Sequence, residues 1–270
     1  MKNMEHVCNE IKSAAYQNHQ VFEKIDHLMA YYDGLVQTSH PFMPSGTLWS
    51  SNYASDIYMS IEVTLESIKM TMKAGHLTDA FVLMRKLFDT MLVDIFYDVM
   101  RKSNYDFENG GIVEEVDNWI RGKQRIPRTE KLLEFLRIAS SSKDIYPFFG
   151  WDTDLKVYRE ILDDNVHSTG YNNLLLNCKG LPFVGRVDYL DDAATMLVQI
   201  ATVHIAFVFF LNGHFMTPHD YEHYLDEDQT PPYGNNRWSA SYAQAAFDEF
   251  IKPHAELAAF LKERCVLDIN

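Results

Sequence analysis

The hydrophobic positions of this chain recur at intervals of three and four residues, which is the spacing of an apolar stripe on an α-helix. The first such segment covers residues 4–33, and Gly34 is predicted to end it. The second runs from about Ser55 to Ala74, and Gly75 follows at the position where a left-handed residue is favoured after a helix. The chain therefore begins with a pattern of two long amphipathic helices.

Further helical patterns follow these two. Thr78 is predicted to cap a long central helix that continues to about Ser103. The later helical segments cover residues 113–121, 129–139, 154–167, 188–212, 218–228 and 239–265, the last of them interrupted at Pro253. Residues 168–187 are the least regular stretch, and no segment shows the sustained alternation of a β-strand. The pattern predicts an all-α fold.

The size of the chain fits a multi-helix bundle with a long buried central helix. Its 270 residues are enough for one large helical domain or two small ones. Only 12 Gly and 9 Pro interrupt it, which suits long helices better than a many-turned β fold. We predict a single helical domain over residues 1–270, with its core at about 55–215 and a C-terminal helical extension at 216–270.

The most apolar stretch, Ala193–Leu211, is about long enough to span a bilayer. It contains Gln199 and His204, however, and no cluster of Lys or Arg flanks it. A helix buried on all sides in a large helical domain has the same pattern. We therefore expect a core helix with Gln199 and His204 hydrogen-bonded, and no membrane partner.

The net charge of −14 argues against a broad nucleic-acid surface, so any contact with RNA or DNA must be local. The densest positive patch consists of Arg121, Lys123, Arg125 and Arg128. This patch could hold a phosphate, but a solvated loop between helices is the default interpretation. The acidic balance also disfavours docking on anionic lipid.

The cysteines and the amino terminus point to a cytoplasmic protein. Cys8, Cys178 and Cys265 are widely spaced and form no C-x-x-C pair, so they are predicted to be reduced thiols. The first residues, MKNMEHVCNEIKS, lack the apolar segment of a signal peptide.

Two charged residues interrupt the apolar central helix. Arg85 and Asp89 stand four residues apart on one helical face, among Leu, Met and Phe neighbours. A buried ion pair is costly unless its surroundings compensate, so the pair marks either an architectural clasp or a functional site. We expect Arg85 to be largely buried and to contact Asp89 or a polar group of the helix that carries His167.

Arg159, Asp163 and His167 are spaced at i, i+4 and i+8, which places them along one stripe of a helix. A carboxylate beside an imidazole raises its pKa and orients it, and a guanidinium can hold a phosphate. Such a trio could cleave RNA without a metal, by positioning a ribose 2′-hydroxyl against the neighbouring phosphate. The alternative is an ordinary Arg–Asp pair on a solvated face, with His167 interacting with the helix dipole.

The segments AGHLTDAFVLMRKLFDTMLVDIFYD and YREILDDNVHSTG resemble the HEPN-like helical proteins of bacteria, in which an arginine-bearing helix precedes a helix that ends in a histidine. The resemblance covers about residues 55–215 and implies an all-α bundle with a polar cleft between the motif helices. It implies that Arg159 and His167 are site residues and that Arg85 and Asp89 support them. Ribonuclease members have four to six residues between the arginine and the histidine, whereas this chain has seven.

Two functions stay open at this point. The first is a metal-independent endoribonuclease of the defence or toxin type, with His167 as general acid or base and Arg159 holding phosphate. The second is a non-catalytic helical interaction or scaffold module in which the same polar residues are structural. The resemblance also implies a two-fold homodimer with the His167 helix near the shared surface, and the 17 Phe, 15 Tyr and 12 Met favour an apolar interface.

Metal and cofactor sites have little support in the sequence. His219 and His223 are spaced i, i+4, which is compatible with a transition metal, but H-x-x-x-H alone is a weak motif. No Walker A loop, G-x-G-x-x-G or G-x-S-x-G motif occurs. We therefore predict no cofactor.

Overall fold

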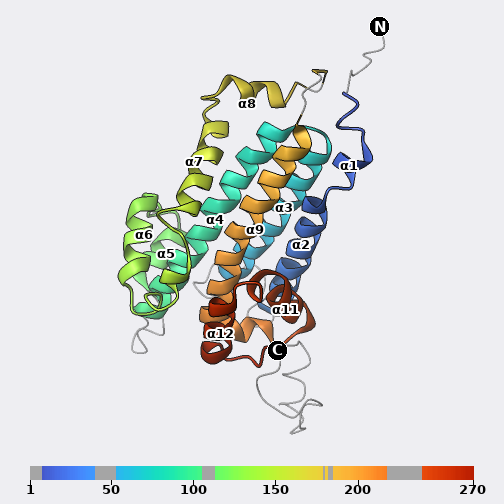
Figure 1. Ribbon diagram of the computed structural model, residues 1–270. Coiled ribbons are helices and arrows are strands. Elements are labelled where there is room, and N and C mark those ends of the chain that lie inside the picture. Colours follow the sequence, from blue (N-terminus) through green and yellow to red (C-terminus); the bar gives the residue numbers. More distant parts are fainter. Residues whose placement is uncertain (1–7, 40–52, 105–112, 179, 182–184, 218–238) are drawn as a thin grey trace. The chain divides into compact units, whose positions relative to one another are not determined.

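The computed structural model describes residues 8–39, 53–104, 113–178, 180–181, 185–217 and 239–270, and these residues fold into helices (Figure 1). The helices are α1 (Ala14–Gln17), α2 (Gln20–Ser39), α3 (Tyr53–Lys73), α4 (Leu77–Ser103), α5 (Glu114–Ile120), α6 (Thr129–Ile138), η1 (Tyr146–Phe148), α7 (Asp154–Val166), α8 (Tyr171–Leu176), α9 (Arg186–Asn212), η2 (Gly213–Met216), α11 (Ser241–Ala246), η3 (Phe247–Ile251) and α12 (Ala255–Arg264). No β-strand occurs in this part of the chain. The predicted all-α fold is confirmed.

The described residues form two compact units. Unit 1 draws on the ranges 1–29, 61–90 and 150–201, and unit 2 draws on 30–60, 91–149 and 202–270. Helices α2, α3, α4 and α9 each contribute residues to both units.

The first predicted helix is wrong in its extent, because the described residues form two helices with a break between them. The Ser13 side chain accepts a hydrogen bond from the backbone of Tyr16 and caps α1, which ends at Gln17. The ring of His19 then accepts a hydrogen bond from the backbone of Val21, 3.2 Å away, at the start of α2. Local capping by Ser13 and His19 thus interrupts a hydrophobic pattern that continues through both helices.

Gly34 does not end α2, which continues to Ser39, so the prediction for this residue is also wrong. A Cβ atom at position 34 would lie 2.5 Å from the ring of Tyr242. The ring packs directly against the helix backbone, and its hydroxyl lies 2.8 Å from the Thr38 hydroxyl. Gly34 therefore permits a close approach within unit 2 rather than a helix end.

The start of α4 also differs from the prediction. Gly75 has a φ of +82° after α3, as expected, but Thr78 lies inside α4 and does not cap it. The Thr78 hydroxyl donates to the backbone carbonyl of Asn173 in α8, and the Asn177 side chain accepts from the Thr78 backbone at 3.0 Å. The side chain of Asn177, which lies in the segment 168–187 that was predicted to be irregular, therefore accepts a hydrogen bond from a backbone N–H at the start of α4.

The long apolar helix is a core helix, as predicted. The helical segment Arg186–Met216 is long and apolar enough to cross a membrane, but 78% of its most apolar window is buried inside the protein. His204 is fully buried and hydrogen-bonded through both ring nitrogens. Gln199 is partly exposed, and its expected hydrogen bond stays a prediction.

The C-terminal helices are interrupted as the sequence predicts. A π-helical turn, η3, follows α11, and Lys252, Pro253 and His254 separate it from α12. The predicted acidic helix at 218–228 lies outside the described residues.

Candidate functional site

Arg85 joins α4 to α7 within unit 1. Its Nε atom lies 2.5 Å from Oδ1 of Asp163, and its guanidinium also pairs with Asp89 one turn along α4. The Arg85 side chain is only 11% exposed, whereas the side chains of Asp89 and Asp163 are 49% and 36% exposed. The expected burial of Arg85 is confirmed, and its guanidinium contacts both of the groups expected as alternatives, Asp89 and a carboxylate of the helix that precedes His167.

The electrostatics of Arg85 follow from these contacts. Burial alone would lower the pKa of Arg85, but hydrogen bonds from its guanidinium to Asp89 and Asp163 outweigh burial and raise the pKa above its usual value. The guanidinium therefore stays charged and clasps two helices together.

Asp163 lies between two arginines and not beside a histidine. The Nε atom of Arg159 is 3.8 Å from Oδ2 of Asp163, so the two carboxylate oxygens face different guanidinium groups. His167 is the residue after the last turn of α7, and its backbone N–H donates to the Asp163 carbonyl at 3.0 Å. Its exposed imidazole makes no hydrogen bond or ion pair with the described part of the chain. The structure brings Arg85, Arg159 and Asp163 together and leaves the His167 imidazole apart.

The backbone turns sharply after His167. Ser168 has a φ of +49°, and the backbone N–H of Thr169 donates to the Asp164 carbonyl at 3.1 Å. The Thr169 hydroxyl also donates to Oδ1 of Asp164 at 2.7 Å. This closure of the helix end directs the chain away from α7 at the residue that carries the imidazole.

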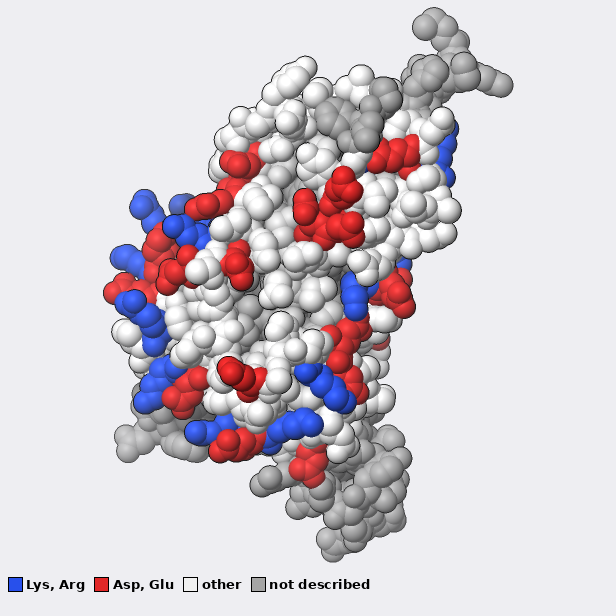
Figure 2. Space-filling view, viewed as in Figure 1, with Lys and Arg blue, Asp and Glu red and all other residues white. Residues whose placement is uncertain are grey.

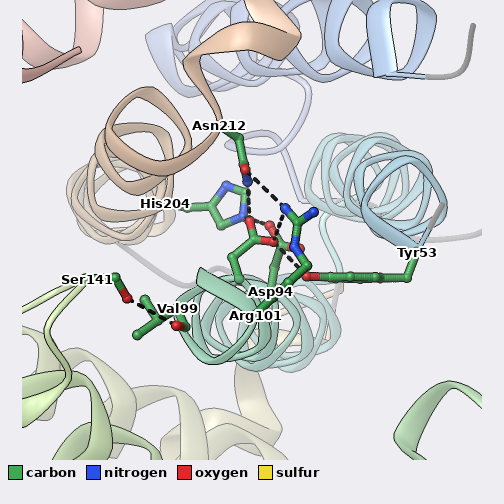
Figure 3. Close-up of polar contacts among 8 residues, drawn as sticks. Tyr53, Asp94, Val99, Arg101, Ser141, His204 and Asn212 are labelled. Atoms are coloured by element: carbon green, nitrogen blue, oxygen red, sulfur yellow. Dashed lines mark hydrogen bonds and ion pairs between the residues drawn. The ribbon is translucent and has the colours of Figure 1, made fainter. Parts of the chain in front are cut away.

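A second polar cluster lies buried in unit 2, where residues of α3, α4 and α9 point toward one another (Figure 3). Nε2 of His204 lies 2.8 Å from Oδ2 of Asp94, and Nδ1 of His204 lies 2.8 Å from the Tyr32 hydroxyl. The side chains of His204 and Asp94 are 0% and 1% exposed. This pair is sealed from water.

The same cluster continues along α4 to a second carboxylate. Oδ1 of Asp98 accepts a hydrogen bond from the Tyr53 hydroxyl at 2.6 Å, and Oδ2 accepts one from the Asn212 side chain. The Arg101 guanidinium lies 3.5 Å from Oδ1 of Asp98 and 3.3 Å from the side-chain oxygen Oδ1 of Asn212 (Figure 3). Asp98 is therefore compensated by one cation and two neutral donors.

Burial sets the protonation of the His204–Asp94 pair. Desolvation raises the pKa of Asp94 well above its usual value, and the nearby Asp98 carboxylate adds to this effect. Desolvation also lowers the pKa of His204 from 6.5 to about 3. Both shifts favour the form of the pair that holds one proton and carries no net charge.

The sequence interpretation missed Asp94, Asp98 and Arg101. All three lie in α4, and the two aspartates fall within the same apolar stretch that drew attention to Arg85 and Asp89. The missed signal was the spacing of Asp94 and Asp98, which puts two carboxylates one turn apart among Val, Ile and Phe. His204 was correctly expected to be a hydrogen-bonded core histidine.

Unit 1 also contains a pocket of about 250 Å³ whose walls come from α4, α7, α8 and α9. Neither the arginines of the clasp nor His167 line this pocket. The pocket is therefore distinct from the predicted catalytic residues.

The remaining sequence candidates do not form a defined site in the described residues. Arg121, Lys123, Arg125 and Arg128 are exposed around α5 and α6, where Figure 2 shows a gathering of Lys and Arg side chains. Arg121 pairs with Asp117 at 2.7 Å, as in an ordinary i, i+4 ion pair. The metal candidates His219 and His223 lie outside the described residues. Within the described residues, no group of three or more His, Cys, Asp or Glu side chains could hold a metal ion. Cys8, Cys178 and Cys265 are free thiols.

No protein-family description, curated protein or solved structure was found to match this chain.

Proposed function

We propose that this chain is a HEPN-like, non-catalytic helical interaction module that acts as a homodimer in the cytoplasm. The observation that carries this proposal is the position of Asp163, which lies 2.5 Å from Arg85 and 3.8 Å from Arg159. The polar residues of the motif helices are therefore engaged in holding α7 on α4.

Catalysis by the predicted trio would require a different arrangement. A histidine general base needs a partner that orients its ring, and a phosphate-binding arginine needs donors that are available to the phosphate. Both oxygens of Asp163 face arginines, and those contacts draw the guanidinium groups towards a carboxylate. This arrangement supports a structural role for Arg159 and Asp163.

We expect the protein to leave RNA intact, and His167→Ala to behave identically. The imidazole has no oriented partner, so its loss removes no catalytic geometry. The measurement is cleavage of single-stranded and hairpin RNAs in the presence of EDTA, with protein in excess of RNA. Cleavage by the unaltered protein that is lost in His167→Ala would instead support an endoribonuclease, the second candidate, which the exposure of His167 favours.

The proposed interaction surface is the outer face of α7. Its exposed residues recur at the spacing of one helical face and are Lys156, Val157, Glu160, Ile161 and Asp164. The side chains of Val157 and Ile161 are apolar and 49% and 41% exposed. In the proposed contact surface these two apolar side chains form the centre and the charged residues form the rim.

The charge order of this α7 face favours a second copy as the occupant. Lys156 lies near the N-terminal end of α7 and Asp164 near its C-terminal end. An antiparallel, two-fold pairing brings Val157 of each copy to Ile161 of the other, and Lys156 of each copy towards the acidic end of the other helix. The face is thus complementary to itself, and this complementarity offsets the repulsion between two chains of charge −14.

We expect the protein to have about twice its chain mass of 31.3 kDa in light scattering at micromolar concentration, and Val157→Glu to be monomeric. The new carboxylate would be desolvated in the apolar centre of the interface. The matched control is Met70→Glu on α3, where the side chain is 66% exposed and outside the α7 face. A monomeric unaltered protein, or a dimer that survives Val157→Glu, would contradict the proposed interface.

A further inference from the structure

The pocket of unit 1 has the lining of a small-molecule site. Its apolar wall includes Phe81 of α4, Leu176 of α8 and Met196 of α9. The phenol rings of Tyr158 and Tyr189 also line it. The volume of about 250 Å³ is near the lower end of ligand pockets, so the pocket fits a small organic molecule and not a polymer.

The charged groups of the pocket are all acidic. Asp164 of α7 and Asp192 of α9 line it, and none of the described residues that line it is a Lys, Arg or His. Figure 2 shows Asp and Glu side chains gathered over the N-terminal part of α9, the part that carries Asp192. A ligand with positive charge would therefore meet two anionic groups without a competing protein cation.

Asn165 adds a buried acceptor to the same wall. The residue is 5% exposed, and its Nδ2 atom donates to the Ile161 carbonyl at 2.9 Å, which fixes the orientation of the side-chain amide. Its buried Oδ1 atom has no hydrogen-bond donor in the part of the chain that the structure describes. This amide therefore lies behind the pocket surface, and its hydrogen bond to Ile161 holds the α7 wall of the pocket in place.

We infer that this pocket binds a small organic amine with an aromatic or aliphatic body. The carboxylates of Asp164 and Asp192 bind its ammonium group, and Tyr158 and Tyr189 pack on its body. This ligand site goes beyond the proposed interaction module. It shares Ile161 and Asp164 with the α7 face, so its test relies on variants other than those that test the dimer.

The test is calorimetric titration of the full chain with 2-phenylethylamine, and with 3-phenylpropionate as a probe of similar shape and opposite charge. We expect saturable binding of the amine and no binding of the carboxylate. Asp192→Asn should weaken amine binding about tenfold, because it removes one charge-assisted hydrogen bond, and the double variant with Asp164→Asn should weaken it further.

The matched control is Asp191→Asn. Asp191 is the neighbour of Asp192 in α9, but its carboxylate faces His19 at 3.0 Å and does not line the pocket. This variant should bind the amine as the unaltered protein does, and circular dichroism should show that all three variants are folded. The inference is overturned if the amine does not bind, if the carboxylate probe binds equally well, or if Asp192→Asn and Asp191→Asn have the same affinity.

Discussion

Replacing Asp94 with asparagine is expected to change the pH dependence of stability on both sides of pH 6.5. In the unaltered protein, the contribution of the buried His204–Asp94 pair is lost as the pH rises above 6.5. In Asp94→Asn, the corresponding contribution is lost as the pH falls below 6.5. The change in slope is about 1.4 kcal/mol per pH unit, which is the effect of one proton.

The direction follows from counting protons on the two groups. The native pair keeps one proton, because burial raises the pKa of Asp94 and lowers that of His204 to about 3. With ordinary pKa values of 3.8 and 6.5, the unfolded pair holds one proton between those pH values and none above 6.5. The stability contribution is therefore flat from pH 3.8 to 6.5, and it falls above 6.5 until the native pKa of Asp94 is reached.

In Asp94→Asn, only the proton of His204 has to be counted. Burial is the first cause of the lowered pKa of His204, and Asp94→Asn does not relieve it. Native His204 then holds no proton, while unfolded His204 gains one below pH 6.5 and favours unfolding there. Stability in the variant should thus rise with pH up to 6.5 and then become level.

Urea unfolding at intervals from pH 5 to pH 8 measures both profiles. As the pH rises, the free energy of unfolding of Asp94→Asn should increase relative to that of the unaltered protein by about 1.4 kcal/mol per pH unit. Asp89→Asn, the same substitution at a half-exposed position of α4, should keep the profile of the unaltered protein. A stability difference between Asp94→Asn and the unaltered protein that stays constant with pH would show that the folded pair holds no proton, with Asp94 ionised beside a neutral His204.

The contrast between Asp89 and Asp94 also shows how far the sequence could lead. Both aspartates lie in α4 among apolar residues, and helical periodicity correctly predicted that helix and the burial of Arg85 beside Asp89. Periodicity cannot say which carboxylate is sealed, since that depends on partners from other helices. Asp98 is paired with Tyr53, which is 45 residues away, and with Asn212, which is 114 residues away.

The same limit applies to the candidate site. The spacing of Arg159, Asp163 and His167 predicts a shared helical stripe, and two of the three do interact. The partner that decides the chemistry, Arg85, is 78 residues from Asp163 in the chain. His167 is the residue after the last turn of α7. Its backbone N–H still donates to the Asp163 carbonyl, but its imidazole pairs with no carboxylate among the described residues.

The second large effect is expected at Arg186, which begins α9 and is fully buried. Its NH1 atom lies 3.4 Å from Oε2 of Glu10 and donates to the Leu181 carbonyl at 3.2 Å, and NH2 donates to the Cys178 carbonyl at 3.1 Å. Oε1 of Glu10 accepts from the backbone N–H of Arg186 at 2.6 Å and so satisfies the start of α9. One ion pair thus holds three segments of unit 1 together.

Arg186→Ala is expected to lower the free energy of unfolding by about 3–5 kcal/mol, the cost of removing one partner of a buried ion pair. The Glu10 side chain is only 22% exposed, so water replaces the lost guanidinium poorly, and two carbonyls lose their donors. Arg186→Met should also be strongly destabilised. Methionine keeps most of the packing volume, but it cannot pair with Glu10 or donate to the two carbonyls. The control is Arg121→Ala, whose exposed pair with Asp117 should leave the urea midpoint nearly unchanged. Equal midpoints for Arg186→Ala and Arg121→Ala would show that Arg186 does not hold unit 1 together.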